Sequence, residues 1–222
     1  MRNKSIIGIA LFILFSTFIS QNQFTINKFE IKEIKIENNE ILDNQELIKI
    51  FSFLYSKNII FLNSYELKKN IDQNSFIEKI EIKKIFPDKI VIKVFEKEPI
   101  AIIIDKYQKK NYLGKKTNLI KFRKILKYEN LPIVRGEPNN FKKLFNNLIK
   151  INFPIDQIIS YQHFKINRWN IEMIDGKILK LPEKNFTESL INFMSIKDKS
   201  NFEKYKIFDY RLNNQLVLKM NE

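Results

Sequence analysis

The residues able to support acid–base, nucleophilic or metal chemistry are few in this chain. It has no cysteine and a single histidine, His163, which excludes disulfides, thiolate metal sites and cysteine nucleophiles. His163 stands apart from any cluster of Asp and Glu, and such a histidine is more often a half-buried polar residue than a ligand. No GxSxG, HExxH or glycine-rich phosphate loop occurs. We therefore predict a protein that is not an enzyme, without catalytic residues, metal site or cofactor.

The charge of the chain raises the question of an anionic partner. Lys and Arg number 39 against 25 Asp and Glu, a net charge of +14 over 222 residues. This excess would normally suggest nucleic acid or an acidic surface. The lysines, however, are spread along the sequence instead of being gathered in one patch, which is typical of solvated faces. We predict no nucleic-acid partner and no small-molecule substrate.

The amino end is the most apolar part of the chain. Arg2 and Lys4 precede an uncharged stretch from Ser5 to Ser20. Sixteen residues rise only about 24 Å as a helix, against a hydrocarbon core of about 30 Å, so polar residues 21–23 would lie at the far interface. The positive-inside rule places residues 1–4 in the cytoplasm. The residues predicted to span the membrane are Ser5, Ile6, Ile7, Leu11, Phe12, Ile13, Leu14, Phe15, Phe18, Ile19 and Ser20.

A cleaved signal peptide is the alternative interpretation of this segment. Signal peptidase prefers small residues at positions −3 and −1 of its site. Cleavage after Ser16, Thr17 or Ser20 would place a bulky leucine or phenylalanine at −3 in each case. The sequence therefore favours an uncleaved anchor.

Residues 29–98 have the pattern of one small folded unit. Apolar residues alternate with charged ones at 33–37 and again at 77–86 and 89–96, as in half-buried strands. Between the strands at 33–37 and 77–86, the spacing of apolar residues predicts two helices, with Asp43 and Ser64 as candidate caps. Pro87 and Asp88 suit the turn between the last two strands. The expected order is strand, helix, helix, strand, strand, in which two helices cover one face of a three-stranded sheet.

The remaining residues, 99–222, predict a larger unit of strands with helices. Strands are expected at 100–105, at 169–181 around the Asp175-Gly176 turn, and at 206–212 and 215–220. Residues 141–149 have the apolar spacing of an amphipathic helix. Asn185 with Glu188 could cap another helix.

The first unit resembles a POTRA domain of the FtsQ/DivIB cell-division family. The resemblance depends on the order of its elements after an anchor, on Phe86-Pro87 in the late hairpin, and on the pattern Glu96, Pro99, Ala101 at its exit. Further family-like patterns follow in the second unit: Leu131 to Gly136, Arg168 to Ile171, Asp175 to Pro182, and Asp209 with Arg211. No single pattern is specific, but their order and spacing match the β domain that follows POTRA in this family.

The expected fold is α+β: a single transmembrane helix, a small β-α-α-β-β POTRA-like domain, and a mostly antiparallel β domain with helices. The expected boundaries are 1–4 for a short cytoplasmic tail, 5–20 for the anchor, 21–28 for a linker, 29–98 for the POTRA-like domain and 99–222 for the β domain.

The resemblance implies a non-enzymatic, single-pass scaffold of the bacterial inner membrane, with its bulk in the periplasm and enriched at the division septum. Its implied partners are FtsB/FtsL-like proteins and other divisome components. We expect them to bind by strand addition to the last strand, whose edge needs a neighbour on one side only. The predicted partner-binding residues are Arg211, Leu212, Asn214, Leu216, Val217 and Leu218, with Phe193 beneath the partner strand.

A POTRA-type module for protein secretion or outer-membrane assembly is the second hypothesis. It would require a membrane barrel of repeated alternating strands, for which 222 residues leave no room.

Overall fold

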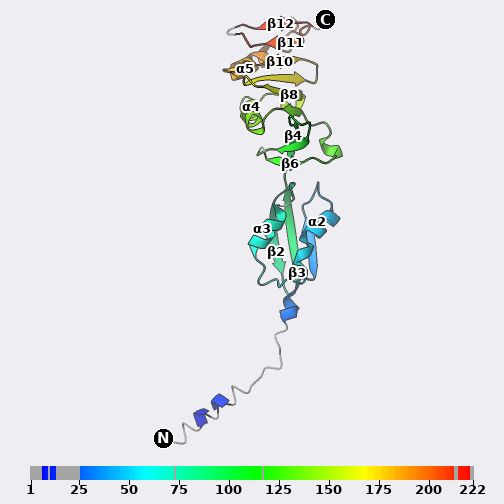
Figure 1. The fold of residues 1–222 in the computed structure, drawn as a ribbon, viewed down its shortest axis with the longest axis vertical. Helices are drawn as coiled ribbons and strands as arrows, with labels where there is room; N and C mark the ends of the chain where they lie inside the picture. Colours follow the sequence, from blue (N-terminus) through cyan, green and yellow to red (C-terminus); the bar gives the residue numbers. More distant parts are fainter. Residues whose placement is uncertain are drawn as a thin grey trace. The chain divides into compact units, whose positions relative to one another are not determined.

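The structure, a computed structural model, describes residues 7–9, 11–13, 26–72, 74–116, 118–212 and 215–220. It divides into two compact units, one of residues 1–73 with 79–95 and one of residues 74–78 with 96–222. Figure 1 shows the helices and strands of both units.

The predicted membrane segment is described only in part. Ile7, Leu11, Phe12 and Ile13 lie in short helical stretches with exposed side chains. Within the described residues, no helix has both the length and the apolar character needed to cross a bilayer. The other predicted span residues, Ser5, Ile6, Leu14, Phe15, Phe18, Ile19 and Ser20, lie outside the described part.

A three-stranded sheet covered by two helices forms the first unit, as the sequence predicts. Strand β1 runs parallel to β3, and the sheet order is β1-β3-β2. The elements are η1 (Ile26–Phe29), β1 (Glu33–Glu37), α2 (Asn44–Phe51), η2 (Ser52–Leu54), α3 (Ser64–Ile71), β2 (Ile77–Ile85) and β3 (Lys89–Glu96).

The alternation of β3 determines which face of this sheet is buried. Ile90, Ile92 and Val94 are fully buried, and α2 contributes Leu47 and Phe51 to the same core. The intervening residues of β3 are half-buried or exposed. The period of two therefore places one face of the strand under the helices and leaves the other to solvent.

The capping at all three predicted helix starts differs from expectation. Asp43 occupies the position before α2 but makes no side-chain cap hydrogen bond. Asn63, not Ser64, caps α3, because its Oδ1 accepts a hydrogen bond from the backbone N–H of Tyr65 at 2.9 Å. Asn185 has a left-handed backbone (φ 57°), again without a side-chain cap bond. The positions of the helices are confirmed, but the capping geometry is not.

The second unit is built on a nine-stranded mixed sheet of order β12-β11-β10-β9-β8-β7-β4-β5-β6. Its strands are β4 (Pro99–Ile104), β5 (Lys110–Gly114), β6 (Leu119–Lys121), β7 (Ile133–Arg135), β8 (Ile158–Phe164), β9 (Arg168–Met173), β10 (Ile178–Lys180), β11 (Ile207–Asp209) and β12 (Val217–Lys219). Its helices are η3 (Leu126–Tyr128), α4 (Pro138–Lys150), η4 (Ile155–Gln157) and α5 (Phe186–Ile196).

Most neighbouring strands of this sheet are antiparallel, but three pairs are parallel: β4 with β7, β7 with β8, and β10 with β11. Helix α4 connects β7 to β8, and α5 connects β10 to β11. A parallel pair requires a crossover connection of this kind. The two helices thus account for two of the three parallel pairs, and β5, β6 and η3 form the connection between β4 and β7.

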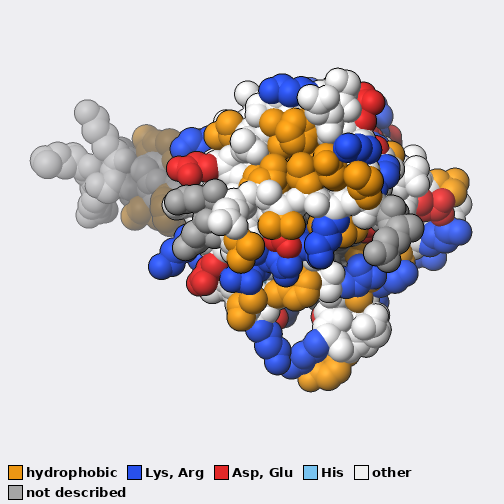
Figure 2. Space-filling model, turned by 90° about the horizontal axis from the view of Figure 1, so that it is seen from above, with side chains coloured by type: hydrophobic (Ala, Val, Ile, Leu, Met, Phe, Trp, Pro, Cys, Tyr) orange, Lys and Arg blue, Asp and Glu red, His pale blue; other side chains and the backbone are white. Residues whose placement is uncertain are grey.

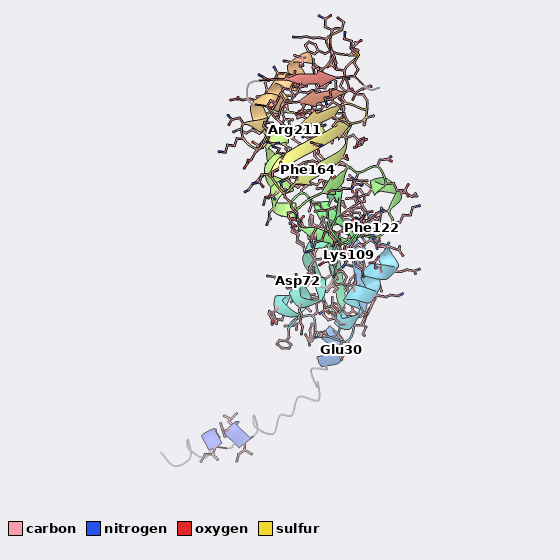
Figure 3. All side chains as sticks on the ribbon, turned by 45° about the horizontal axis from the view of Figure 1, so that its top comes forward. Glu30, Asp72, Lys109, Phe122, Phe164 and Arg211 are labelled. Carbon is pink, nitrogen blue, oxygen red and sulfur yellow. The ribbon has the colours of Figure 1, made fainter. Side chains whose placement is uncertain are left out.

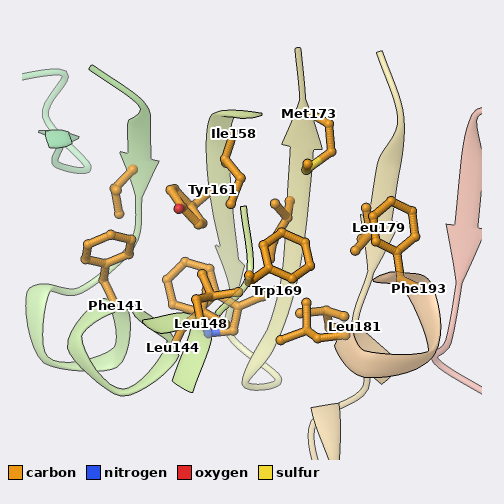
Figure 4. Close-up of a cluster of buried hydrophobic side chains, with 14 of the residues drawn as sticks. Phe141, Leu144, Leu148, Ile158, Tyr161, Trp169, Met173, Leu179, Leu181 and Phe193 are labelled. Carbon is orange, nitrogen blue, oxygen red and sulfur yellow. The ribbon is translucent and has the colours of Figure 1, made fainter. Parts of the chain in front are cut away.

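Both helices cover a single hydrophobic core (Figure 4). Phe141, Leu144 and Leu148 of α4 and Phe193 of α5 are all buried in it. Phe141 meets the ring of Tyr161 on β8 at 5.0 Å between centroids. This packing holds the strands from β7 to β11 against one helical layer.

Candidate partner-binding edge

Strand β12 is the last strand of the large sheet at one side. It pairs with β11 alone among the described strands, antiparallel, with Phe208 opposite Leu218 and Asp209 opposite Val217. The prediction that the final strand forms a sheet edge is confirmed. A strand in this position can offer main-chain groups to another chain.

The hydrogen bonds of β11 determine which groups of β12 face outward. Ile178 donates its backbone N–H to the Lys206 carbonyl at 2.7 Å, and Tyr210 donates to the Lys180 carbonyl at 2.9 Å. Strands β10 and β11 are parallel, with Leu179 opposite Phe208. Phe208 lies between Lys206 and Tyr210 at the same spacing of two, so its main-chain groups also face β10. Main-chain groups of successive strand residues point to opposite sides, so those of Ile207 and Asp209 face β12.

It follows that Val217 and Lys219, the partners of Asp209 and Ile207, direct their N–H and C=O groups toward β11. Leu218 lies between them and directs its own N–H and C=O away from β11, to the open edge. Among the three β12 residues, Leu218 therefore carries the main-chain donor and acceptor that an added strand would use.

The side chains around this edge are largely apolar. Leu216 and Leu218 are half-buried and pack against the core, and Val217 is also half-buried. Leu212 and Met220 are exposed. Figure 2, which looks onto the β12 side of the second unit, shows hydrophobic side chains gathered in a band with Lys and Arg around it. The edge thus combines open main-chain groups with an apolar surface.

Phe193 has a different place from the one predicted. It is fully buried, lies against Phe208 of β11 at 5.0 Å between ring centroids, and stacks on Phe153 at 6.2 Å. A residue in this position supports β11 from inside the core. The prediction of Phe193 as a partner-binding residue is corrected accordingly: its role here is to hold the edge in place.

Arg211 is also engaged within the chain. Its Nε donates to Oδ1 of Asp209 at 2.8 Å and its second guanidinium nitrogen donates to Oδ2 at 2.6 Å. Burial raises the pKa of Asp209, but the hydrogen bonds and charge of Arg211, with the charge of Lys180, lower it by more in total. The carboxylate is therefore ionised and its pKa lies below the usual range. Figure 3 labels Arg211 beside the last strands. Asn214, also predicted, lies outside the described residues.

A groove of about 580 Å³ lies between α5 and the segment that leads into β12. Leu212 and Leu216, both predicted, line it together with Glu188, Asn192 and Tyr210. Tyr210 donates its hydroxyl to Oδ1 of Asn192 at 2.9 Å, and burial raises the pKa of this tyrosine. The groove lies next to the open edge and can accept side chains that flank an added strand.

Sequence reasoning missed the contribution of α5 to this groove. Glu188 and Asn192 are four residues apart, which places them on the same side of a helix. That spacing was the available signal, but it is common on solvated helix faces. Only the hydrogen bond between Asn192 and Tyr210 distinguishes this helix face from an ordinary solvated one.

Nothing in the described part of the chain forms a metal site: no three His, Asp or Glu side chains there gather closely enough to hold an ion. His163 instead lies against Trp169 at 4.6 Å between ring centroids. Burial lowers the pKa of His163, which favours its neutral form.

Residues 29–97 match the family model described as "POTRA domain, FtsQ-type". The chain is 29% identical over 196 residues to a cell division protein FtsQ of Rickettsia bellii, covering 86% of this chain and 72% of that protein. It is 26% identical to the FtsQ of Rickettsia felis, with the same coverage. A cell division protein DivIB of Clostridium tetani is 32% identical over 85 residues, which cover 38% of this chain and 31% of that protein.

A solved structure, the major extracytoplasmic domain of the cell division protein DivIB from Geobacillus stearothermophilus, overlaps 48% of this chain and 96% of its own, at 16% identity and a TM-score of 0.31. Three observations point to the same kind of protein: the strand and helix order of the first unit, the FtsQ-type POTRA match, and the relatives that span most of the sequence. Residues 29–97 thus form a POTRA domain of the FtsQ type, and over most of its length the chain is similar to the FtsQ/DivIB cell-division proteins.

Proposed function

We propose that this protein is a bitopic inner-membrane scaffold of the divisome that recruits FtsB/FtsL-like partners in the periplasm during septum formation. The partner binds by adding a strand to β12. The observation that carries the proposal is the open edge of β12, where Leu218 directs its main-chain N–H and C=O away from β11.

Strand addition suits this edge for physical reasons. Main-chain hydrogen bonds supply affinity for an extended segment of almost any sequence, and pockets for alternate side chains supply specificity. The apolar surface of Leu212, Leu216 and Val217 and the groove beside α5 provide such contacts. The core contact of Phe193 with Phe208 keeps β11 in position, so the edge is formed before the partner arrives.

The membrane arrangement is part of the same proposal. Residues 5–20 anchor the chain, residues 1–4 remain in the cytoplasm, and a POTRA-like domain of residues 29–98 and a β domain of residues 99–222 lie in the periplasm. Arg2 and Lys4 stand directly before the apolar stretch, whereas the first basic residue after it is Lys28, and this difference supports the orientation.

Localisation in cells tests the divisome role. A fluorescent fusion is expected to gather at midcell, and depletion of the protein is expected to give filaments. A uniform envelope signal with normal division would remove the hypothesis. The mass of the mature chain tests the anchor separately: an intact anchor leaves the chain beginning at its original amino terminus, whereas cleavage leaves it beginning near Gln21.

A further inference from the structure

One end of the first unit exposes a group of large apolar side chains. Phe61 is 79% exposed, Phe86 58% and Ile60 46%, and Ile85 is also exposed. They come from two segments, residues 56–61 and 84–88. With residues 28–32, where the chain enters the unit, these segments form what we call the entry end. A folded domain rarely exposes several large apolar side chains together without a surface to cover them.

Hydrogen bonds hold the three segments of the entry end together. The backbone N–H of Ile59 donates to the Phe29 carbonyl at 2.8 Å, and that of Lys32 donates to the Asp88 carbonyl at 2.8 Å. Lys84 reaches across with its Nζ to the carbonyl of Ile60 at 3.3 Å. Phe29 and Phe86 lie edge to face, with ring centroids 6.5 Å apart. The apolar group is therefore a fixed part of the fold.

The same end is basic. Its three segments contain Lys28, Lys32, Lys57 and Lys84, against two carboxylates, Glu30 and Asp88. Glu30, labelled in Figure 3, marks this end of the unit, and both carboxylates are half-buried whereas Lys28, Lys32 and Lys84 are exposed. Exposed aromatic and aliphatic side chains among lysines are the combination that binds the interface of an anionic bilayer.

We infer that the entry end lies in the headgroup region of the membrane, with Phe61 and Phe86 inserted at its surface and the lysines on anionic lipid phosphates. The inference rests on the proposed anchor at residues 5–20. Phe29 follows Ser20 by nine residues, which span at most about 30 Å even when fully extended. An anchored chain cannot carry this end far from the bilayer.

The short range of electrostatic attraction requires the entry end to lie close to the lipid headgroups. Exposed charges are screened beyond about 8 Å at physiological ionic strength, so the lysines attract anionic lipid only when the entry end is at the surface. The short linker keeps it there without a partner protein. Binding of this kind orients the first unit on the membrane and restricts its rotation about the linker. It also fixes the height of the first unit above the bilayer.

Site-specific labelling tests the inference in the full-length chain. The protein has no cysteine, so Phe61→Cys and Tyr107→Cys each create a single site for an environment-sensitive fluorophore. The two positions are matched, since both are exposed aromatic residues, at 79% and 78%. Each labelled chain is reconstituted in vesicles of phosphatidylglycerol and phosphatidylethanolamine that contain a nitroxide-bearing lipid as quencher.

The expected result is quenching at position 61 at least twofold stronger than at position 107, and weaker quenching at 61 when phosphatidylcholine replaces phosphatidylglycerol. Equal quenching at both positions in chains that float with the vesicles would overturn the inference and leave the anchor intact. A fluorophore at position 61 that is shielded from water but not quenched would also overturn it, since a second copy of the chain then covers the patch. Chains that fail to float would refute the anchor and the inference with it, whereas the capture of a partner is measured separately.

Discussion

Arg211 forms two parallel hydrogen bonds with Asp209, at 2.8 Å and 2.6 Å, at the point where β11 ends and the chain turns toward β12. Asp209 is nearly buried, and Arg211 is partly open to solvent. The arrangement neutralises a carboxylate that the sheet has removed from water. It also fixes the direction in which the chain leaves β11, immediately before the proposed binding edge.

Removing the guanidinium is expected to destabilise the fold. Arg211→Ala leaves the Asp209 carboxylate without its main donor, and we expect the free energy of unfolding to fall by about 1 kcal/mol, since the pair is partly exposed. Urea unfolding in mild detergent, followed by the fluorescence of the single tryptophan, measures it. Lys115→Ala is the control, because Lys115 pairs with Glu98 on an exposed surface. An equal loss in both variants would contradict the special role of Arg211.

The same pair predicts a pH dependence. The pKa of Asp209 is below its usual value of 3.8, so the folded state favours the ionised carboxylate. The resulting stability is present above pH 3.8 and is lost as pH falls through the lower pKa of the folded state. We expect the stability difference between the wild type and Arg211→Ala to be constant from pH 5 to 7 and to shrink below pH 3.8. A difference that persists at the lowest pH where the protein folds would argue against this charge pairing.

Strand addition at β12 predicts different effects of proline at Leu218 and at Val217: loss of partner capture at the first position and loss of stability at the second. Leu218→Pro removes a main-chain donor that points away from β11, so we expect it to abolish capture of an FtsB-like partner by the immobilised chain. Leu218→Ala keeps that donor while removing most of the side chain, and it should retain measurable capture. If Leu218→Pro and Leu218→Ala bind equally, the edge is not the interface.

Val217→Pro should act on the fold itself. Its N–H faces Asp209 within the sheet, so proline removes a ladder hydrogen bond of the chain. We expect the free energy of unfolding to fall by about 1–3 kcal/mol, and any loss of capture to follow from the displaced strand. Unchanged stability would show that the main-chain groups of β12 point the other way.

The core residue Phe193 offers a test of what holds the edge in place. Phe193→Ala removes a fully buried ring between Phe153 and Phe208, and we expect a loss of about 3–5 kcal/mol of stability. Ile191→Ala, on the exposed side of the same helix, should change stability by about 0.5 kcal/mol or less. A partner-contact role for Phe193 would instead predict lost capture with stability unchanged.

Local patterns accounted for much of the fold. The apolar alternation at Ile90, Ile92 and Val94 predicted a strand with one buried face, and the structure buries all three. The Asp175-Gly176 pair predicted a hairpin, and Gly176 has the positive φ of 79° that favours glycine there. Such signals depend on residues close in the sequence, so they can be recognised without knowing the rest of the fold.

Some features of the proposed binding edge follow from local sequence patterns, and others depend on residues distant in the chain. The sequence by itself determined that a strand lies within residues 215–220 and that the first unit has the order strand, helix, helix, strand, strand. Only the tertiary structure decided that β11 lies parallel to β10, which turns the main-chain groups of Leu218, and not those of Val217, outward. It also placed Phe193 in the core and paired Arg211 with Asp209. The physical reason is that strand register and burial depend on partners distant in the chain, whereas strand and helix periodicity is written in neighbouring residues.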